Sequence, residues 1–335
     1  MTTSRRDVLT LAAGALAAPA LASPALAASA SAHDGPHDAG APEELRLWPG
    51  TPPGGPAPAP LVEKAADQSK DPAHPDRFIT GITQPRLIVY RPQRPNGSAV
   101  LLMPGGGYQF LSYDNEGVSQ ARWLNARGIT AFILLYRLPG EGWAKREDVP
   151  LQDAQRAMRL IRAQAEHFGI QPNRVAIIGF SAGGHLAGSL ATRHAEQVYA
   201  PVDEADRQSA RPDLAGLVYP VISLSAPFTH AGSRDALLGP DSAEALRRQY
   251  SVDQRVDART PPCFFVHAGD DGLVPPANSI SCYSALQALQ RPAELHIFSA
   301  GGHGFGVRLP ASMTASAWPQ LFTGFAVSQG IVPAA

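Results

Sequence analysis

The sequence has few charged residues and no surplus of either sign. Charged residues make up 17% of the 335 residues, and the formal net charge at pH 7 is −1. Nucleic acids and anionic membrane surfaces call for a basic surplus, so this balance argues against both as the main partner. The apolar fraction of 44% is ordinary for a soluble globular protein, and a chain of this length can bury a sizeable core.

The sequence also has little cysteine. Its two cysteines, Cys263 and Cys282, do not make a disulfide framework in a chain of this size. Cys263 lies in an apolar, strand-like run, so we expect a small buried hydrophobe in preference to a bridge with Cys282. No CxxC, HExxH or Cys/His cluster occurs, and the sequence therefore predicts no metal site and no cofactor.

The first 27 residues have the features of an export signal. Arg5 and Arg6 precede a long Ala/Leu-rich run, and Ala25-Leu26-Ala27 matches an A-x-A cleavage pattern. Paired arginines before a weakly apolar run are typical of twin-arginine export, to the periplasm or the extracellular space. Pro19 and Pro24 interrupt the run, which disfavours an uncleaved membrane anchor. We therefore expect no stable membrane insertion after the signal is removed.

Residues 28–44 are rich in Ala, Pro and Gly and predict a flexible lead-in to a folded domain at residues 45–331. Within that domain, short apolar runs alternate with helical patterns. The expected strands cover residues 87–90, 99–103, 129–136, 175–178, 214–222, 263–266 and 295–298, and the expected helices cover 118–125, 151–168 and 279–289. This alternation predicts an α/β fold with a mainly parallel sheet of about eight strands and helices on both faces.

Residues 179–183 read Gly-Phe-Ser-Ala-Gly and match the GxSxG motif. The motif follows an expected strand and precedes a run of small residues with helical character. In this context the strand turns sharply into the helix, and the flanking glycines leave room for close packing. The central residue then projects beside a helix N-terminus, which favours developing negative charge. Ser181 is therefore the predicted nucleophile.

A serine hydroxyl needs a base to accept its proton, and the base needs an acid to orient it. His303 is the best candidate for the base, because it lies in the glycine-rich loop 301–306 after the last expected strand. The other histidines that we weighed lie in a helix, a strand or a connection: His185, His267 and His230. Asp270 and Asp271 follow the strand near residue 266, and either can serve as the acid. The order Ser, Asp, His along the chain is that of α/β-hydrolases.

The loop Pro104-Gly105-Gly106-Gly107-Tyr108 follows an early strand. Consecutive glycines let the backbone approach a substrate closely. The N–H groups of Gly106 and Gly107 are therefore the expected donors to the oxyanion of a tetrahedral intermediate, together with the N–H of Ala182.

Together these motifs resemble the esterase branch of the α/β-hydrolases related to hormone-sensitive lipase, and within it the bacterial acetyl-xylan-esterase-like group. The resemblance spans about residues 45–330, and its narrower motifs are PGGGY at 104–108 and GFSAGGHLA at 179–187. Pro104 stands where lipase-like relatives have His, so any side-chain role of that His is lost while the backbone donors remain. The resemblance favours Asp271, four residues before Pro275, over Asp270 as the acid.

The resemblance implies a secreted serine carboxylic-ester hydrolase that deacetylates xylan or xylo-oligosaccharides through an acyl-enzyme. A general short-chain carboxylesterase is the main alternative. A serine peptidase of the prolyl-oligopeptidase type is disfavoured, because Ala182 replaces the usual aromatic and the N-terminal region is short. A non-catalytic binding protein is disfavoured because all three triad candidates are present. Glycoside hydrolysis usually needs two facing carboxylates, and the sequence reveals no such pair.

Five residues are candidates for contact with substrate. Tyr108 is a candidate for stacking on a sugar ring, as are Tyr113 and Trp143, although aromatic residues more often pack in the core or at a rim. Glu116 is a candidate to bind sugar hydroxyls or to cap the adjacent helix, with the structural role favoured. His230 lies in the 223–262 connection, which we expect to overhang the site.

The Pro-rich start of the domain and the modest length of the 223–262 connection predict little or no cap domain. An open site of this kind suits an acetylated oligosaccharide or a small ester substrate.

Beneath the site, we expect Arg137 and Asp153 to form an ion pair.

Overall fold

The computed structural model describes residues 43–55, 57, 60–72 and 74–334, which belong to one compact unit. The predicted signal at residues 1–27 and the predicted lead-in up to residue 42 lie outside the described residues. The last two residues of that lead-in, Glu43 and Glu44, already belong to strand β1 (Glu43–Arg46). The folded unit therefore begins earlier than the apolar pattern indicates, because this edge strand is mostly exposed and polar.

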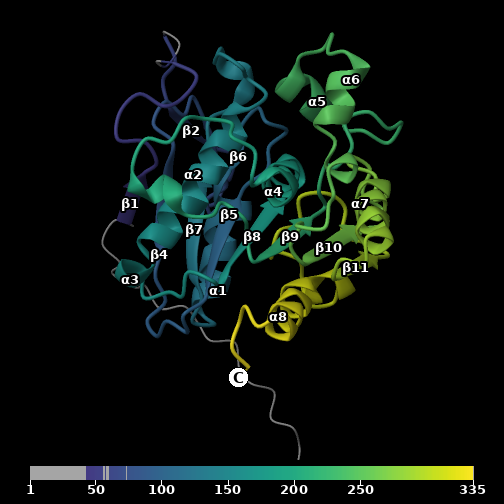
Figure 1. The fold of residues 1–335 in the computed structure, drawn as a ribbon. Helices are drawn as coiled ribbons and strands as arrows, with labels where there is room; N and C mark the ends of the chain where they lie inside the picture. The colour runs from purple at the N-terminus through teal and green to yellow at the C-terminus, as the bar shows by residue number, and fades with distance from the viewer. Residues whose placement is uncertain (1–42, 56, 58–59, 73, 335) are drawn as a thin grey trace, which may run out of the picture. The chain divides into compact units, whose positions relative to one another are not determined.

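An eight-stranded sheet in the order β1-β4-β7-β5-β8-β9-β10-β11 forms the centre of the unit (Figure 1). β4 runs antiparallel to β1 and β7, and all other neighbours are parallel. The prediction of a mainly parallel sheet of about eight strands is confirmed. The strands after β1 are β4 (Arg86–Tyr90), β5 (Ala99–Met103), β7 (Thr130–Leu135), β8 (Val175–Phe180), β9 (Leu214–Val218), β10 (Cys263–Ala268) and β11 (Ala293–Phe298).

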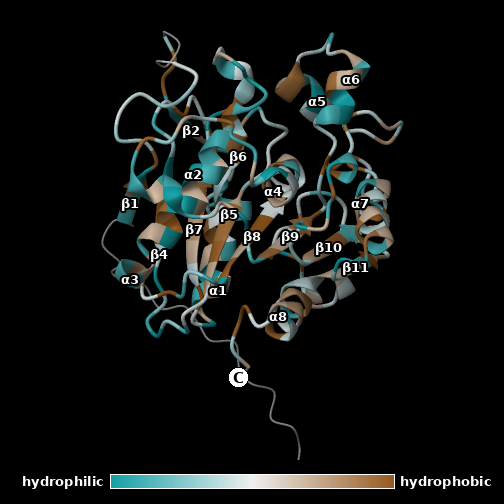
Figure 2. Cartoon of the chain, in the orientation of Figure 1, coloured by the Kyte–Doolittle hydropathy of each residue, from teal (hydrophilic) through white to brown (hydrophobic). Residues whose placement is uncertain are grey.

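The central strands form the hydrophobic core. Every residue of β5, β7, β8, β9 and β10 is buried, which explains their mostly apolar sequences (Figure 2). The strand expected over 214–222 ends at Val218, because Tyr219 has a φ of 36° and the chain leaves the sheet there. Cys263 and Cys282 are buried and unpaired, as predicted.

Helices pack on both faces of this sheet. A Cβ on Gly216 of β9 would lie 2.8 Å from the Phe322 ring of helix α8. A Cβ on Gly179 of β8 would lie 2.6 Å from Ala187 of α4. Gly216 pairs with Ile178, so Gly179 points to the opposite face, and α4 and α8 therefore lie on opposite sides. The helices between and after these strands include α1 (Ser119–Asn125), α2 (Val149–Ala163), α4 (Ser181–Arg193), α7 (Ala277–Ala288) and α8 (Trp318–Ser328), and the one-turn helix α3 (Ala165–Phe168) follows α2.

Several elements were not predicted. A second, three-stranded sheet contains β2 (Lys64–Asp67), β3 (Arg77–Thr80) and β6 (Leu111–Ser112). The 223–262 connection between β9 and β10 contains two short helices, α5 (Ala231–Leu238) and α6 (Glu244–Gln249). A π-helical turn, η1 (Asp114–Val118), leads into α1. Short 3₁₀ turns complete the unit: η2 (Pro139–Glu141), η3 (Glu204–Arg207), η4 (Val252–Gln254) and η5 (Thr314–Ala317).

The predicted ion pair between Arg137 and Asp153 is confirmed, and both side chains are fully buried. The guanidinium donates from Nη2 to Oδ1 at 2.8 Å and from Nε to Oδ2 at 2.9 Å. Trp48 Nε1 donates a further bond to Asp153 Oδ1 at 2.8 Å. The pair therefore joins the loop after β7, helix α2 and the segment after β1.

Among the described residues, no helix is long and apolar enough to span a membrane.

Candidate active site

Ser181 stands at the turn between β8 and α4. Its φ is 53°, in the left-handed region that a non-glycine residue rarely occupies, whereas the preceding Phe180 is extended. Close backbone contacts enforce this turn: a Cβ on Gly179 would lie 2.2 Å from the carbonyl oxygen of Gly183, and one on Gly183 would lie 2.1 Å from that of Met103. The two flanking glycines of GxSxG are thus required by space as well as by turn geometry.

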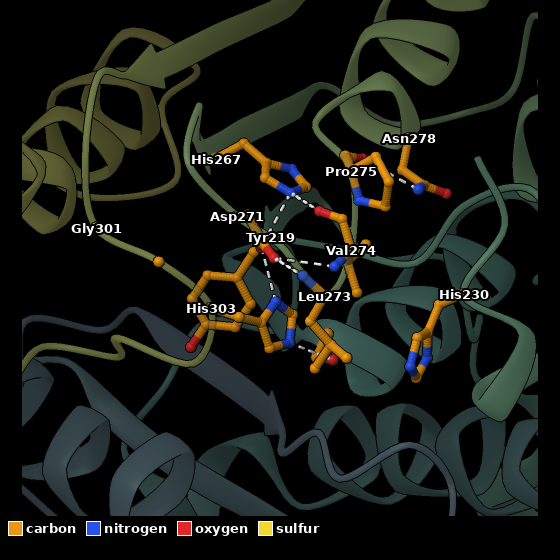
Figure 3. Close-up of polar contacts among 12 residues, drawn as sticks. Tyr219, His230, His267, Asp271, Leu273, Val274, Pro275, Asn278, Gly301 and His303 are labelled. Atoms are coloured by element: carbon orange, nitrogen blue, oxygen red, sulfur yellow. Dashed lines mark hydrogen bonds and ion pairs between the residues drawn. The ribbon is translucent and has the colours of Figure 1, made fainter.

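A chain of two hydrogen bonds joins three of the predicted site residues. His303 Nε2 lies 2.9 Å from Ser181 Oγ. His303 Nδ1 lies 2.7 Å from Asp271 Oδ2 (Figure 3). With the Nδ1 proton directed at the carboxylate, Nε2 is the acceptor for the serine proton. The geometry therefore suits proton transfer from the hydroxyl to the imidazole as the oxygen attacks a carbonyl.

The carboxylate of Asp271 is held by donors on both oxygens. Oδ1 accepts bonds from the N–H groups of Leu273 and Val274, each at 2.9 Å. Oδ2 faces both His303 and the buried His267, whose Nε2 lies 3.3 Å away (Figure 3). Burial by itself would raise the pKa of Asp271, but the bonds from His267, His303 and Val274 outweigh it and hold the pKa well below its ordinary range. Asp271 is therefore ionised at neutral pH.

Asp270 has a different position. Its Oδ1 accepts bonds from the N–H groups of Gly301 and Gly302, at 2.9 and 2.8 Å. These two glycines immediately precede His303. Of the two carboxylates that the sequence left open, Asp271 contacts the imidazole and Asp270 anchors the loop that carries it.

The three predicted oxyanion donors are the backbone N–H groups of Gly106, Gly107 and Ala182. Gly106 and Gly107 have φ values of 128° and 64°, and a Cβ on Gly106 would lie 2.1 Å from the carbonyl oxygen of Phe110. Within the described ranges, their N–H groups have no protein acceptor. Ala182 lies in the first turn of α4, where N–H groups lack an intrahelical partner.

The predicted substrate contacts of Tyr108 and Glu116 are not supported. Tyr108 is 2% exposed, and its hydroxyl bonds to His185 Nδ1 at 2.8 Å, so its ring face is not free for a sugar. Glu116 is 3% exposed, and both of its oxygens bond to protein groups. It does not cap α1 either, because it lies inside η1. Tyr113 and Trp143 are also buried. Tyr113 packs in the hydrophobic core, and the Trp143 ring packs against the guanidinium of Arg137.

His230 is half-buried and stands at the start of α5, near His303 and Asp271. Its Nδ1 accepts from the Ser233 N–H at 3.3 Å and contacts the Ser233 hydroxyl at 2.8 Å. Acceptance at Nδ1 places the ring proton on Nε2. Burial and the neighbouring His303 lower the pKa of His230, so the ring is neutral at neutral pH and offers one N–H donor.

A cavity of about 410 Å³ opens beside the oxyanion loop, between it, the turn after β7 and helix α5. Gln109 and Tyr108 line one side, and Asp235 lies on the α5 side. The residues that complete the lining are Leu138, Gly140, Glu141, Gly232 and Ala236. The predicted connection thus contributes a helix to the site, which the sequence pattern did not reveal.

Tyr219 is a site residue that the sequence analysis missed. Its ring lies 4.9 Å from the His303 ring, centroid to centroid (Figure 3). Its hydroxyl donates to Glu116 Oε1 at 2.8 Å. From the sequence alone, Tyr219 is only one more residue of an expected apolar strand. A polar residue at the carboxyl end of a parallel strand was the available signal.

The depressed pKa of Asp271 has a consequence for stability. A carboxyl whose pKa is lower in the folded than in the unfolded chain stabilises the fold at higher pH, and loses that contribution as pH falls through about 4 towards the folded pKa. We expect Asp271→Asn to lower Tm most at neutral pH, with the difference from wild type shrinking below about pH 4.

Thermal unfolding of both proteins from about pH 7 to about pH 3 measures this difference. Asp241→Asn, at an exposed carboxylate, is the matched control and should change Tm little at any pH. A difference between wild type and Asp271→Asn that stays constant over the range would contradict the electrostatic account.

The sequence and the fold match known hydrolases. The BD-FAE family model matches residues 87–286. An acetylxylan esterase of Xylanibacter ruminicola is 36% identical over 225 residues, which are 66% of this chain and 44% of that protein. Endo-1,4-beta-xylanase B of Butyrivibrio fibrisolvens is 36% identical over 208 residues, 62% of this chain and 32% of that protein. The chain thus spans less than half the length of each of these two relatives.

A solved structure agrees with these matches over nearly the whole folded unit. The acetyl ester-xyloside bifunctional hydrolase of Caldicellulosiruptor lactoaceticus superposes with a TM-score of 0.69 at 34% identity, covering 87% of this chain and 97% of that one. The order of strands, the turn at Ser181 and these matches lead to one conclusion: the chain belongs to the BD-FAE family and has the α/β-hydrolase fold.

Proposed function

We propose that this protein is a serine esterase that removes acetyl groups from acetylated xylan or xylo-oligosaccharides. The observation that carries the reaction type is the pair of hydrogen bonds that joins Ser181, His303 and Asp271, at a serine held in a strained turn. A serine in this arrangement is an activated nucleophile, and the ester carbonyl is its natural target.

In the first half-reaction, Ser181 Oγ attacks the acetyl carbonyl carbon while His303 Nε2 takes the hydroxyl proton. The tetrahedral oxyanion accepts bonds from the N–H groups of Gly106, Gly107 and Ala182. The intermediate collapses, the C–O bond to the sugar breaks, and the leaving oxygen takes the proton from His303. Asp271 stays ionised and stabilises the transient imidazolium.

The second half-reaction removes the acetyl group from Ser181. His303 takes a proton from a water molecule, whose oxygen attacks the acyl carbonyl, and the same three N–H groups bind the second oxyanion. Collapse of this intermediate releases acetic acid, and the proton on His303 returns to Ser181 Oγ. No cofactor enters either half-reaction.

The carbohydrate part of the proposal has two supports. The relatives named above act, by their names, on acetylated xylan, xylan or xylosides. The cavity beside the oxyanion loop is also suited to a sugar, because Gln109 and Asp235 offer an amide and a carboxylate group to hydroxyls. His230 adds an N–H donor near the same helix.

Export is a further part of the proposal. Arg5 and Arg6 before the Ala/Leu-rich run, together with Ala25-Leu26-Ala27, support passage through the twin-arginine route to the periplasm or beyond. Replacement of both arginines by lysine should leave the precursor inside a competent host. Undiminished export of that variant would argue against this route.

We expect Ser181→Ala to abolish hydrolysis of p-nitrophenyl acetate, because the reaction then loses its nucleophile. The residual rate should lie on the order of 10³-fold or more below wild type. Circular dichroism and Tm should show an intact fold, since the methyl group fits where Cβ already stands. Retained hydrolysis of p-nitrophenyl acetate by this variant would contradict the proposal that Ser181 is the nucleophile of an esterase.

Acetate release from acetylated xylo-oligosaccharides tests the substrate. We expect Asp235→Ala and Gln109→Ala to raise KM for the oligosaccharide about 5- to 50-fold, and to leave p-nitrophenyl acetate hydrolysis within about two-fold, because the small ester does not fill the cavity. Gln287→Ala, an exposed glutamine on α7 outside the cavity, is the matched control. Hydrolysis of small esters with no acetate release from any carbohydrate would indicate a general short-chain carboxylesterase.

A further inference from the structure

The carboxylate of Glu116 takes no part in the two half-reactions, yet it lies between the two loops that serve them. It is 3% exposed and belongs to the π-helical turn η1. Its Oε2 accepts the N–H of Gly105 at 2.7 Å, and its Oε1 accepts the hydroxyl of Tyr219 at 2.8 Å. Both oxygens are therefore bound within the protein.

On one side, Glu116 fixes the start of the oxyanion loop. The peptide group between Pro104 and Gly105 is held at both of its polar atoms, because Tyr136 donates to the Pro104 oxygen at 2.7 Å and Glu116 accepts the Gly105 N–H. This peptide lies against the nucleophile: a Cβ on Gly105 would be 2.9 Å from Ser181 Cβ. The next two N–H groups along the chain are the proposed oxyanion donors.

On the other side, Glu116 fixes the histidine loop through Tyr219. The Tyr219 hydroxyl accepts the N–H of Gly306 at 3.1 Å while its ring packs against His303. The same π-helical turn makes a second contact with this loop, because Asn115 Nδ2 donates to the Gly304 oxygen at 2.7 Å. The turn thus reaches both loops.

We propose that Glu116 is a positioning residue that holds the oxyanion loop and the His303 loop in one fixed relation, through Gly105 on one side and Tyr219 on the other. This inference rests on the proposed esterase function. An oxyanion donor acts at full strength only within a few tenths of an ångström of its productive position, so a shift of either loop lowers transition-state stabilisation more than substrate binding.

The chemistry of the two donors explains why a carboxylate is needed. A carboxylate offers acceptors on both oxygens, whereas an amide offers one acceptor and one donor. In Glu116→Gln, the amide oxygen must face the Gly105 N–H, so the NH₂ group faces Tyr219 and its O–H loses its acceptor. Burial raises the pKa of Glu116, while the bonds from Tyr219 and Gly105 and the nearby His303 oppose that rise.

Kinetics of Glu116→Gln and Tyr219→Phe test the proposal, with p-nitrophenyl acetate and a trifluoromethyl ketone that forms a tetrahedral adduct with the serine. We expect kcat to fall about 10- to 100-fold in each variant, KM to stay within about two-fold, and the affinity for the ketone to fall by a factor similar to that in kcat/KM. The kcat of the double variant should be little lower than that of the worse single variant, because the two substitutions break the same connection.

Asp114→Asn is the matched control, since it makes the same change at a second buried carboxylate of the same turn. Both Asp114 oxygens accept hydrogen bonds from Arg77, which belongs to neither loop. It should lower Tm yet leave kcat within about two-fold of wild type.

Three results would overturn the proposal: wild-type kcat and ketone affinity in folded Glu116→Gln, the same values in Tyr219→Phe, or an equal loss of kcat in Asp114→Asn. If Glu116→Gln does not fold, Tyr219→Phe decides by the same criteria, because its ring still packs on His303. Failure of wild-type protein to hydrolyse any ester would instead refute the proposed function.

Discussion

The site depends on the tight backbone contact where β5 and β8 end. Gly183 approaches the carbonyl oxygen of Met103, and Gly105 approaches Ser181, at distances that exclude any side chain. The left-handed conformation of Ser181 costs on the order of 1–3 kcal/mol and persists only where the surroundings enforce it. Pairing of β8 with β5 and β9, deep in the core, supplies that enforcement. The hydroxyl is thereby fixed relative to both the oxyanion loop and α4.

Two buried carboxylates extend this rigidity to the other parts of the site. Asp271 uses both oxygens to hold His303 and its own loop, and Glu116 uses both of its oxygens to connect Gly105 with Tyr219. Fully bonded buried acceptors of this kind keep dipoles and rings in place before the substrate arrives. The reaction then needs little reorganisation of the protein when charge develops.

The central part of the site could be predicted because its signals are local. GxSxG after an apolar strand, PGGGY after another, and a histidine in a glycine-rich loop each follow from a short stretch of sequence. Local pattern alone left Asp270 and Asp271 open, because adjacent carboxylates look alike, whereas the family resemblance favoured Asp271, and the structure places Asp271 against His303. Strands buried on both faces were equally easy to place, whereas the exposed β2 and the short β6 have no such pattern.

The roles of Glu116 and Tyr219 could not be predicted, because they depend on a contact between residues 103 positions apart. The sequence indicates a sugar contact or, preferably, a helix cap for Glu116, and only the fold reveals that its carboxylate is buried between two loops. The 223–262 connection was expected to overhang the site, but its helix α5 was not predicted, because its packing beside the oxyanion loop is a tertiary feature.

The most direct test of the central claim is to trap the acyl-enzyme. Rapid acid quenching during turnover of p-nitrophenyl acetate, followed by peptide mass spectrometry, locates the acetyl group. The account predicts one acetyl group on the peptide that contains Ser181, at that residue, and none there in Ser181→Ala. An active enzyme that carries its acetyl group on another residue, or on none at any quench time, would contradict it.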